Sequence, residues 1–181
     1  MIRRSNPGPA SAAPAGPFRA RMLPHLDAAY RFARLLSRDA SAAEDIVQDG
    51  YLRAFRSFDG YRGDADRAWL FAILRNCWRD RVRAQPPASE AIEDHEIADD
   101  WTPEAILARK RTITGVREAI EALPAPFREA IVLRELEEMP YREIAGLTGV
   151  PIGTVMSRLA RGRQLLAALL QADQPSEEPS R

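Results

Sequence analysis

The stretch GVPIGTVMSRLARGRQLLAALL, residues 149–170, does most to decide how this chain folds and what it contacts. At about 100° per residue, a helix over this stretch has one apolar stripe. The predicted stripe consists of Ile152, Val155, Leu159, Leu166 and Leu170. The opposite face carries Thr154, Ser157, Arg158 and Arg161, with no carboxylate beside them. Solvated helix faces usually mix both signs of charge, so this face favours a polyanionic partner.

The ten residues YREIAGLTGV, 141–150, predict a short helix that ends at a glycine-containing turn just before this stretch. Two short helices across such a turn form a helix-turn-helix, whose second helix enters the DNA major groove. Arginine can bind guanine O6 and N7 together, while Thr and Ser contact phosphates or bases. Arg163 falls on the apolar side, and we interpret it as structural, paired with Glu135, Glu137 or Glu138. An ordinary solvated amphipathic helix is the alternative.

Helical periodicity continues through almost all patterned segments, and no strand-like alternation of useful length occurs. We therefore predict an all-α protein. The N-terminal module should have a helix over 18–36, a second opened by a capping box at Ser41 and Glu44, and a third capped by Asp64 or Asp66. In the C-terminal module, a helix should begin at Thr102–Pro103 and end near Leu123. Three short helices should follow, divided by Pro124 and Pro126, by Pro140, and by the turn at 149–151.

Charge divides the chain, whose formal net charge is zero, into two basic modules and an acidic segment between them. Residues 84–108 contain seven acidic residues and no Lys or Arg, which is typical of a flexible linker. The predicted organisation is a disordered arm (1–17), a helical domain (18–84), an acidic linker (85–108), a helix-turn-helix domain (109–171) and a disordered tail (172–181).

Several functional classes lack their sequence signals. The single cysteine, Cys77, allows no internal disulfide, suits a reducing cytoplasm, and has the apolar neighbours of a buried thiol. The two histidines lack partners at metal-ligand spacing, so we expect no metal and no other cofactor. We find no nucleophile–base pair and no phosphate loop, and we expect no catalytic residue and no small-molecule substrate. The arm lacks the apolar region of a signal peptide, and no run approaches the ~20 residues of a membrane span, so we expect no direct membrane insertion.

The third predicted helix combines aromatic and basic side chains. Arg75, Arg79 and Arg83 recur at spacing four, with Asn76 adjacent, and Tyr61 and Arg62 precede the helix. Rings that stack on bases and arginines that follow the backbone are the components of single-strand binding. Trp69 and Trp78 are more simply explained as core residues. The second helix instead has a polar edge with Asp45, Gln48 and Asp49, which suits a protein partner or simply complements the helix dipole.

In these segments the sequence resembles the extracytoplasmic-function sigma factors of bacterial RNA polymerase. SAAEDIVQDGYLRAF (41–55) is similar to the family's polymerase-binding helix, and residues 61–83 to its −10 element segment. Residues 123–166, from LPAPFREA to GRQLL, are similar to its C-terminal −35 module. The resemblance covers 26–83 and 123–166, in the family's order, and implies domains like sigma regions 2 and 4.

The resemblance implies roles for the matching positions. Asp45, Gln48, Asp49 and Arg53 would bind the clamp coiled coil of core polymerase, and the C-terminal module its flap. Tyr61, Arg62, Arg75, Asn76, Arg79 and Arg83 would contact the −10 element. Thr154, Ser157, Arg158 and Arg161 would contact the −35 element. Met156 and Ala160 stand where many relatives carry a basic or larger side chain, which leaves the −35 base preference open.

The implied function is transcription initiation: the protein would direct core polymerase to promoters and help to melt them. The implied partners are core RNA polymerase, promoter DNA and an anti-sigma factor. The implied location is the cytoplasm, with the polymerase on the nucleoid or held at the inner membrane by the anti-sigma factor. Two alternatives remain open: a self-sufficient helix-turn-helix regulator, and a protein-interaction module that mimics a sigma factor.

Overall fold

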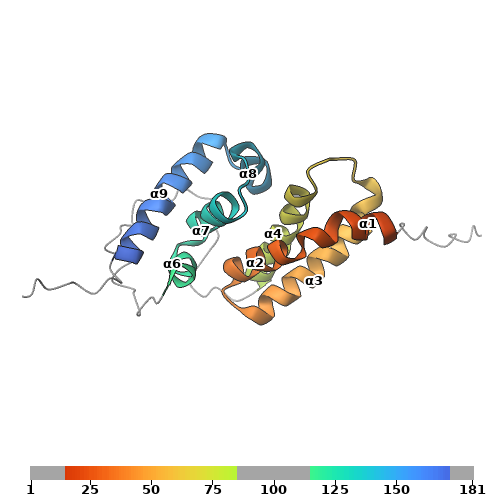
Figure 1. The fold of residues 1–181 in the computed structure, drawn as a ribbon, viewed down its shortest axis with the longest axis horizontal. Coiled ribbons are helices and arrows are strands. Elements are labelled where there is room, and N and C mark those ends of the chain that lie inside the picture. Colours follow the sequence, from red (N-terminus) through yellow and green to blue (C-terminus); the bar gives the residue numbers. More distant parts are fainter. Residues whose placement is uncertain (1–14, 85–114, 172–181) are drawn as a thin grey trace, which may run out of the picture.

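The computed structural model describes residues 15–84 and 115–171. Within these two ranges every regular element is helical, and the elements form two groups that lie side by side (Figure 1). The predicted all-α class and the two helical domains are confirmed. The predictions for the arm, the acidic linker, the helix start at Thr102 and the tail lie outside the described residues.

The N-terminal group contains four α-helices: α1 (Ala15–Met22), α2 (Leu26–Ser37), α3 (Ala40–Ser57) and α4 (Asp66–Ala84). Short 3₁₀ turns at Leu23–His25 and Phe58–Gly60 join α1 to α2 and lead out of α3. The prediction of one helix over 18–36 was wrong because Pro24, in the first of these turns, has no backbone N–H to continue an α-helical ladder.

The cap of α3 also differs from the prediction. Asp39, in extended conformation, is the N-cap, and its Oδ1 accepts a hydrogen bond of 2.7 Å from the Ala42 N–H. Just before it, Arg38 adopts a left-handed conformation (φ 60°) and closes α2 by donating its N–H to the Arg34 carbonyl. The capping box at Ser41 was wrong because the helix already begins at Ala40. An aspartate is a preferred residue at such a position.

α2, α3 and α4 pack around an apolar core. Phe32 stacks on Phe71 with ring centroids 4.8 Å apart. Gly50 lets α3 approach α4 closely, because a side-chain carbon at this position would overlap the Leu74 side chain. Cys77 is buried as predicted, and burial raises the pKa of its thiol. A buried neutral thiol is a poor nucleophile.

Tyr51 fastens α1 to α3 and should give the protein an alkaline titration signature. Its hydroxyl donates to the Met22 carbonyl at 2.9 Å, and burial raises the pKa of Tyr51 to about 12. Up to about pH 10 the phenol is neutral in both the folded and the unfolded chain. Between about pH 10 and 12 only the unfolded chain ionises, so stability should fall over this window. Tyrosinate absorbance should show the delayed ionisation, and Tyr51→Phe should remove it; an unchanged titration curve in Tyr51→Phe would refute the assignment.

The C-terminal group contains α6 (Val116–Ala122), α7 (Ala125–Ile131), α8 (Tyr141–Thr148) and α9 (Ile152–Gln171). A π-helical turn at Val132–Leu136 extends α7. The predicted breaks at Pro124, at Pro140 and at the turn after α8 are all present. Gly149 takes a left-handed conformation (φ 74°) that glycine adopts without steric penalty. α8, this turn and α9 form the predicted helix-turn-helix (Figure 1).

The buried face of α9 is rotated from the predicted stripe by about 60° at 3.6 residues per turn. Its buried residues are Val155, Arg158, Leu159, Gly162, Leu165 and Leu169, while Ile152 is 40% exposed. At Gly162 a side-chain carbon would lie 2.9 Å from Ile131 Cγ1, so α9 crosses α7 at close range. This close crossing turns Gly162, Leu165 and Leu169 towards α7 and moves Ile152 out of the core.

The two helical groups meet through a charged contact, in which α2 packs on α6 and α7, and α4 packs on α8. Between the described ranges 15–84 and 115–171, four ion pairs join an N-terminal arginine to a C-terminal glutamate. They are Arg31–Glu137, Arg34–Glu121, Arg67–Glu137 and Arg75–Glu129. We call this set the inter-module contact. Burial raises the pKa of Glu137 within it, against the opposing effect of Arg31.

Candidate nucleic-acid and polymerase interfaces

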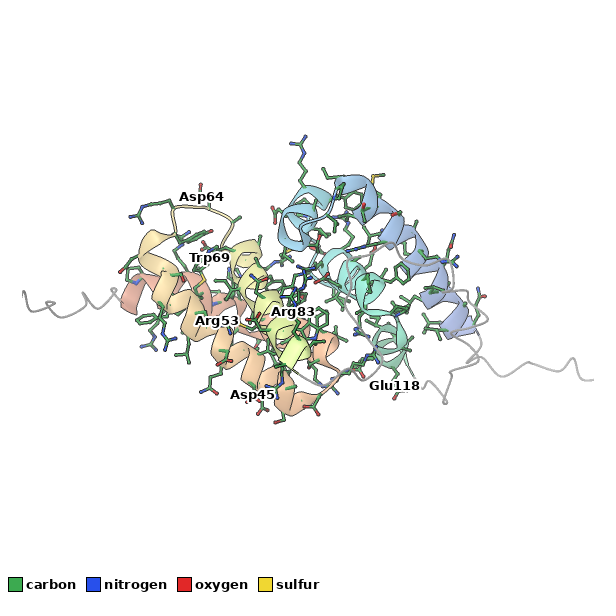
Figure 2. All side chains as sticks on the ribbon, turned by 180° about the vertical axis from the view of Figure 1, so that it is seen from behind. Asp45, Arg53, Asp64, Trp69, Arg83 and Glu118 are labelled. Atoms are coloured by element: carbon green, nitrogen blue, oxygen red, sulfur yellow. The ribbon has the colours of Figure 1, made fainter. Side chains whose placement is uncertain are left out.

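The four predicted polymerase-binding residues share the solvent side of α3. Asp45, Gln48, Asp49 and Arg53 are all exposed. Figure 2 shows Asp45 and Arg53 along the outer side of this helix. Arg53 pairs with Asp80 at 2.8 Å and Asp45 pairs with Arg81 at 2.9 Å, so α4 supports this edge from beside it. The result is an accessible surface of mixed charge, which suits a protein partner better than a nucleic acid.

The loop between α3 and α4 is held by aromatic and charged contacts. Tyr61 stacks on Trp69 with centroids 4.3 Å apart and planes 17° apart. Arg21 of α1 places its guanidinium 5.0 Å from the Tyr61 ring, donates to the Gly63 carbonyl at 2.7 Å and forms an ion pair with Asp66. Desolvation raises the pKa of Tyr61, which stays neutral.

Two residues of this loop site were not predicted from the sequence. Trp69, expected in the core, is half-buried and forms an aromatic wall beside Tyr61. Arg21 lies more than forty residues from the loop that it holds. The sequence did contain a signal for Trp69: a spacing of nine residues puts Trp69 and Trp78 on opposite sides of one helix, and of the two only Trp78 is buried. Arg62 is exposed, and its Nη1 donates to the Asp59 carbonyl at 2.6 Å.

The arginine stripe of α4 is not uniformly exposed. Asn76 and Arg83 are exposed and Arg79 is half-buried, but Arg75 is only 4% exposed. Its Nε donates to Glu129 Oε1 at 2.5 Å and its Nη2 to Glu129 Oε2 at 3.2 Å. The expectation that Arg75 lies on an open DNA-facing surface was therefore wrong for this arrangement, because α7 covers that side of α4. Its contact with DNA stays a prediction that requires the modules to separate.

The predicted DNA-facing residues of α9 also differ in how far they are exposed to solvent. Ser157 is exposed, and its hydroxyl donates to the Thr154 carbonyl at 3.0 Å. Thr154 and Arg161 are half-buried, and Arg161 donates to Gln164 at 3.3 Å. Arg158 is 6% exposed, because the rotated buried face of α9 reaches it. The expected exposure of Arg158 was thus wrong, although its predicted DNA role is untested.

Arg163 pairs with Glu135, at 3.0 Å from Nε and 2.6 Å from Nη2. This partner is one of the three glutamates that the sequence suggested. The pair joins α9 to the π-helical turn, which supports the structural interpretation of Arg163.

In residues 15–84 and 115–171, no three His, Cys, Asp or Glu side chains converge as metal ligands would. None of the helices in these ranges has the length and apolar character needed to cross a membrane.

Comparison with known proteins agrees with both halves of this geometry. The family profile "Sigma-70 region 2" matches residues 22–86, and "Sigma-70, region 4" matches residues 114–166. The RNA polymerase sigma-H factor of Pseudomonas aeruginosa is 33% identical over 145 residues, which cover 74% of this chain and 75% of the relative. The ECF RNA polymerase sigma-E factor of Escherichia coli K12 is 34% identical over 151 residues, covering 76% and 79%. This chain belongs to the extracytoplasmic-function sigma factors.

The sigma factor is also similar to a relative of which it spans little more than half, and to two solved structures. ECF RNA polymerase sigma factor SigE of Mycolicibacterium smegmatis is 39% identical over 146 residues, which are 78% of this chain but 57% of that relative. The sigma factor RpoE of Bartonella quintana, solved in complex with the anti-sigma factor NepR, matches with a TM-score of 0.67 and 30% identity over 87% of this chain and 99% of that one. CnrH, solved with the cytosolic domain of CnrY, matches with a TM-score of 0.60 and 30% identity over 88% of each chain.

Proposed function

We propose that this sigma factor binds core RNA polymerase and directs it to promoters through a −10 and a −35 element. One observation carries the proposal: the chain holds sigma region 2 and region 4 in order, each with an accessible surface of the required chemistry. Reading two elements at once supplies specificity that neither small module has alone.

The exposed side of α3 supports polymerase binding. Asp45, Gln48, Asp49 and Arg53 contact the clamp coiled coil, and the C-terminal module contacts the flap. Both signs of charge are available on this edge, and Asp80 and Arg81 of α4 hold two of its side chains in place.

The loop before α4 and the start of its exposed side support −10 recognition. Tyr61 and Trp69 provide stacked rings for unpaired bases, while Arg62 and Asn76 are exposed beside them. Arg79 and Arg83 follow the DNA backbone, and Arg75 joins them once the modules have separated. In the C-terminal module Ser157 and Arg161 contact the −35 element directly. Thr154 is half-buried on the flank of α9 and contacts a phosphate, whereas Arg158, which is 6% exposed here, would have to turn outward to reach the DNA.

An anti-sigma factor is the proposed inhibitor, since the similar sigma factor RpoE of Bartonella quintana was solved in complex with the anti-sigma factor NepR. The sigma factor is located in the cytoplasm, either free or bound to polymerase at the nucleoid. An inhibitor can also hold it at the inner membrane. It works by binding, without a cofactor and without enzyme chemistry of its own.

Run-off transcription with core polymerase and a library of genomic fragments tests the proposal. We expect defined start sites that share two spaced upstream elements. Arg161→Ala should lower the yield about 5- to 150-fold, which corresponds to the loss of one good base or phosphate contact of about 1–3 kcal/mol. Arg19→Ala, which removes an exposed arginine of α1, is the matched control and should leave the yield unchanged.

Two outcomes would overturn the proposal. The first is a transcript yield no higher than that of core polymerase alone, although immobilised core polymerase retains the protein. This result would favour the sigma-mimicking interaction module. Tight sequence-specific binding to duplex DNA without polymerase would favour a self-sufficient helix-turn-helix regulator.

A further inference from the structure

The outward face of α9 is more apolar than the sequence-based wheel suggested. Opposite the buried line through Val155, Gly162 and Leu169, the exposed residues of the N-terminal half are Gly153, Met156, Ser157 and Ala160. Met156 is 54% exposed, the second-highest value among the large hydrophobic residues that the structure leaves exposed. Ile152, one turn before it, is 40% exposed.

Two of these outward residues are small. At Gly153 nothing lies within 4 Å of a side-chain carbon built on the backbone, and Ala160 carries only a methyl group. Small side chains before and after Met156 allow the helix to approach a flat surface closely at this point. Met156 is then the one large apolar side chain on the outward face; it lies to one side of Gly153 and Ala160, and Ser157 lies to the other.

The arginines that could have read guanine here lie elsewhere. Arg158 is 6% exposed, and Arg163, two turns after Met156 on the same side of α9, is bound to Glu135. Arg161 is half-buried and donates to Gln164, one turn after the centre of the face. In the helix-turn-helix arrangement, the N-terminal part of the second helix contacts the base edges. The side chains at that part of α9 are therefore an unbranched thioether and a hydroxyl.

The major groove offers one apolar feature, the 5-methyl group of thymine. We propose that Met156 reads a thymine methyl in the −35 element, so that this sigma factor prefers a thymine where an arginine in its place would select guanine. The inference rests on the proposed function, since it needs α9 in the major groove of that element. Met156 is thus a specificity-determining residue of the protein–DNA contact.

Replacing single thymines by 2′-deoxyuridine tests this contact, because the exchange removes the methyl group and leaves base pairing intact. The experiment uses the full chain with core polymerase on a promoter found by the run-off assay, with each thymine of the upstream element replaced in turn. One replacement should lower transcript yield about three- to fivefold, as expected for one buried methyl group. With Met156→Ala the same replacement should have no effect, although the yield on the normal promoter is lower.

Val116→Ala is the matched control, because Val116 is 57% exposed in the same module but lies on α6. It should retain the full deoxyuridine effect. The inference fails if no replacement changes the yield, if the element has no thymine, or if Met156→Ala keeps the same sensitivity. The absence of any promoter-dependent transcript would overturn the proposed function itself. Defined transcripts without a methyl effect would overturn only the reading by Met156.

Discussion

Glu129→Gln is expected to weaken the packing between the two modules by about 3 kcal/mol. The side chains of Glu129 and Arg75 are 4% and 5% exposed, and both carboxylate oxygens of Glu129 accept hydrogen bonds from Arg75. Removing one charge of a buried pair leaves the other uncompensated, and this typically destabilises a protein by roughly 3–5 kcal/mol. The glutamine can still accept one hydrogen bond, so we expect the lower end of that range. Small-angle X-ray scattering should show a larger radius of gyration for the variant.

Glu135→Gln is the matched control for this experiment. It also breaks a bond between a glutamate and an arginine, at 2.6 Å, but its side chains are 51% and 42% exposed. Exposed pairs of this kind contribute about 0–1 kcal/mol. The double variant Arg75→Met with Glu129→Leu should restore compactness, because an apolar pair of similar volume can replace a buried ion pair. If Glu129→Gln and Glu135→Gln had equal radii of gyration, the buried pair of Arg75 and Glu129 would not be the main contact that holds the modules together.

The same contact bears on how the sigma factor would engage a promoter. Arg75 cannot hold Glu129 and a DNA phosphate at once, so its proposed −10 role requires the modules to move apart. Each bridging pair joins an arginine of the DNA-binding N-terminal module to a glutamate of the C-terminal module. Under the proposed function, polymerase binding would supply the separation, since it would hold the two modules on two different promoter elements.

The sequence predicted the helices and their breaks well, because these depend on local chemistry. Pro124, Pro140 and the left-handed Gly149 interrupt helices through their own backbone geometry. Pro24 ends a helix and Asp39 caps one through equally local chemistry, but neither was predicted from the sequence. Ser41 matched a capping box, and the apolar residues around Pro24 matched one continuous helix. The exposed positions of α3 followed directly from the helical period.

The environments of Arg75 and Arg158 could not be derived in this way. Arg75 is buried by a helix more than fifty residues later in the chain, and no periodic pattern records that meeting. Arg158 changed sides because Leu165 and Leu169, not Ile152, pack into the core. A helical wheel centred on Ile152 predicts the correct helix but a rotated buried face, and the observed rotation is the basis of the proposal for Met156.

Arg128→Met should destabilise the C-terminal module by roughly 3–5 kcal/mol. Arg128 is 1% exposed, and its Nη1 donates to the carbonyls of Glu121 and Leu123 at 3.0 and 2.7 Å, at the end of α6. Its Nη2 donates to the Leu36 carbonyl at 3.4 Å, near the end of α2. The last carbonyls of a helix lack partners within that helix, and each buried acceptor left without one costs about 1–3 kcal/mol. The thermal midpoint followed by circular dichroism should fall steeply.

Arg117→Met separates this effect from a general loss of positive charge. Arg117 lies in the same module and bonds to Glu121, but its side chain is 61% exposed, and such helical pairs contribute about 0.2–0.5 kcal/mol. Arg128→Lys should fall between the two, because one ammonium group cannot reach carbonyls at the ends of both α2 and α6. If Arg128→Met lowered the midpoint no more than Arg117→Met, the three carbonyls would have to be satisfied by other donors. Arg128 would then not be the residue that ties the end of α2 to the turn between α6 and α7.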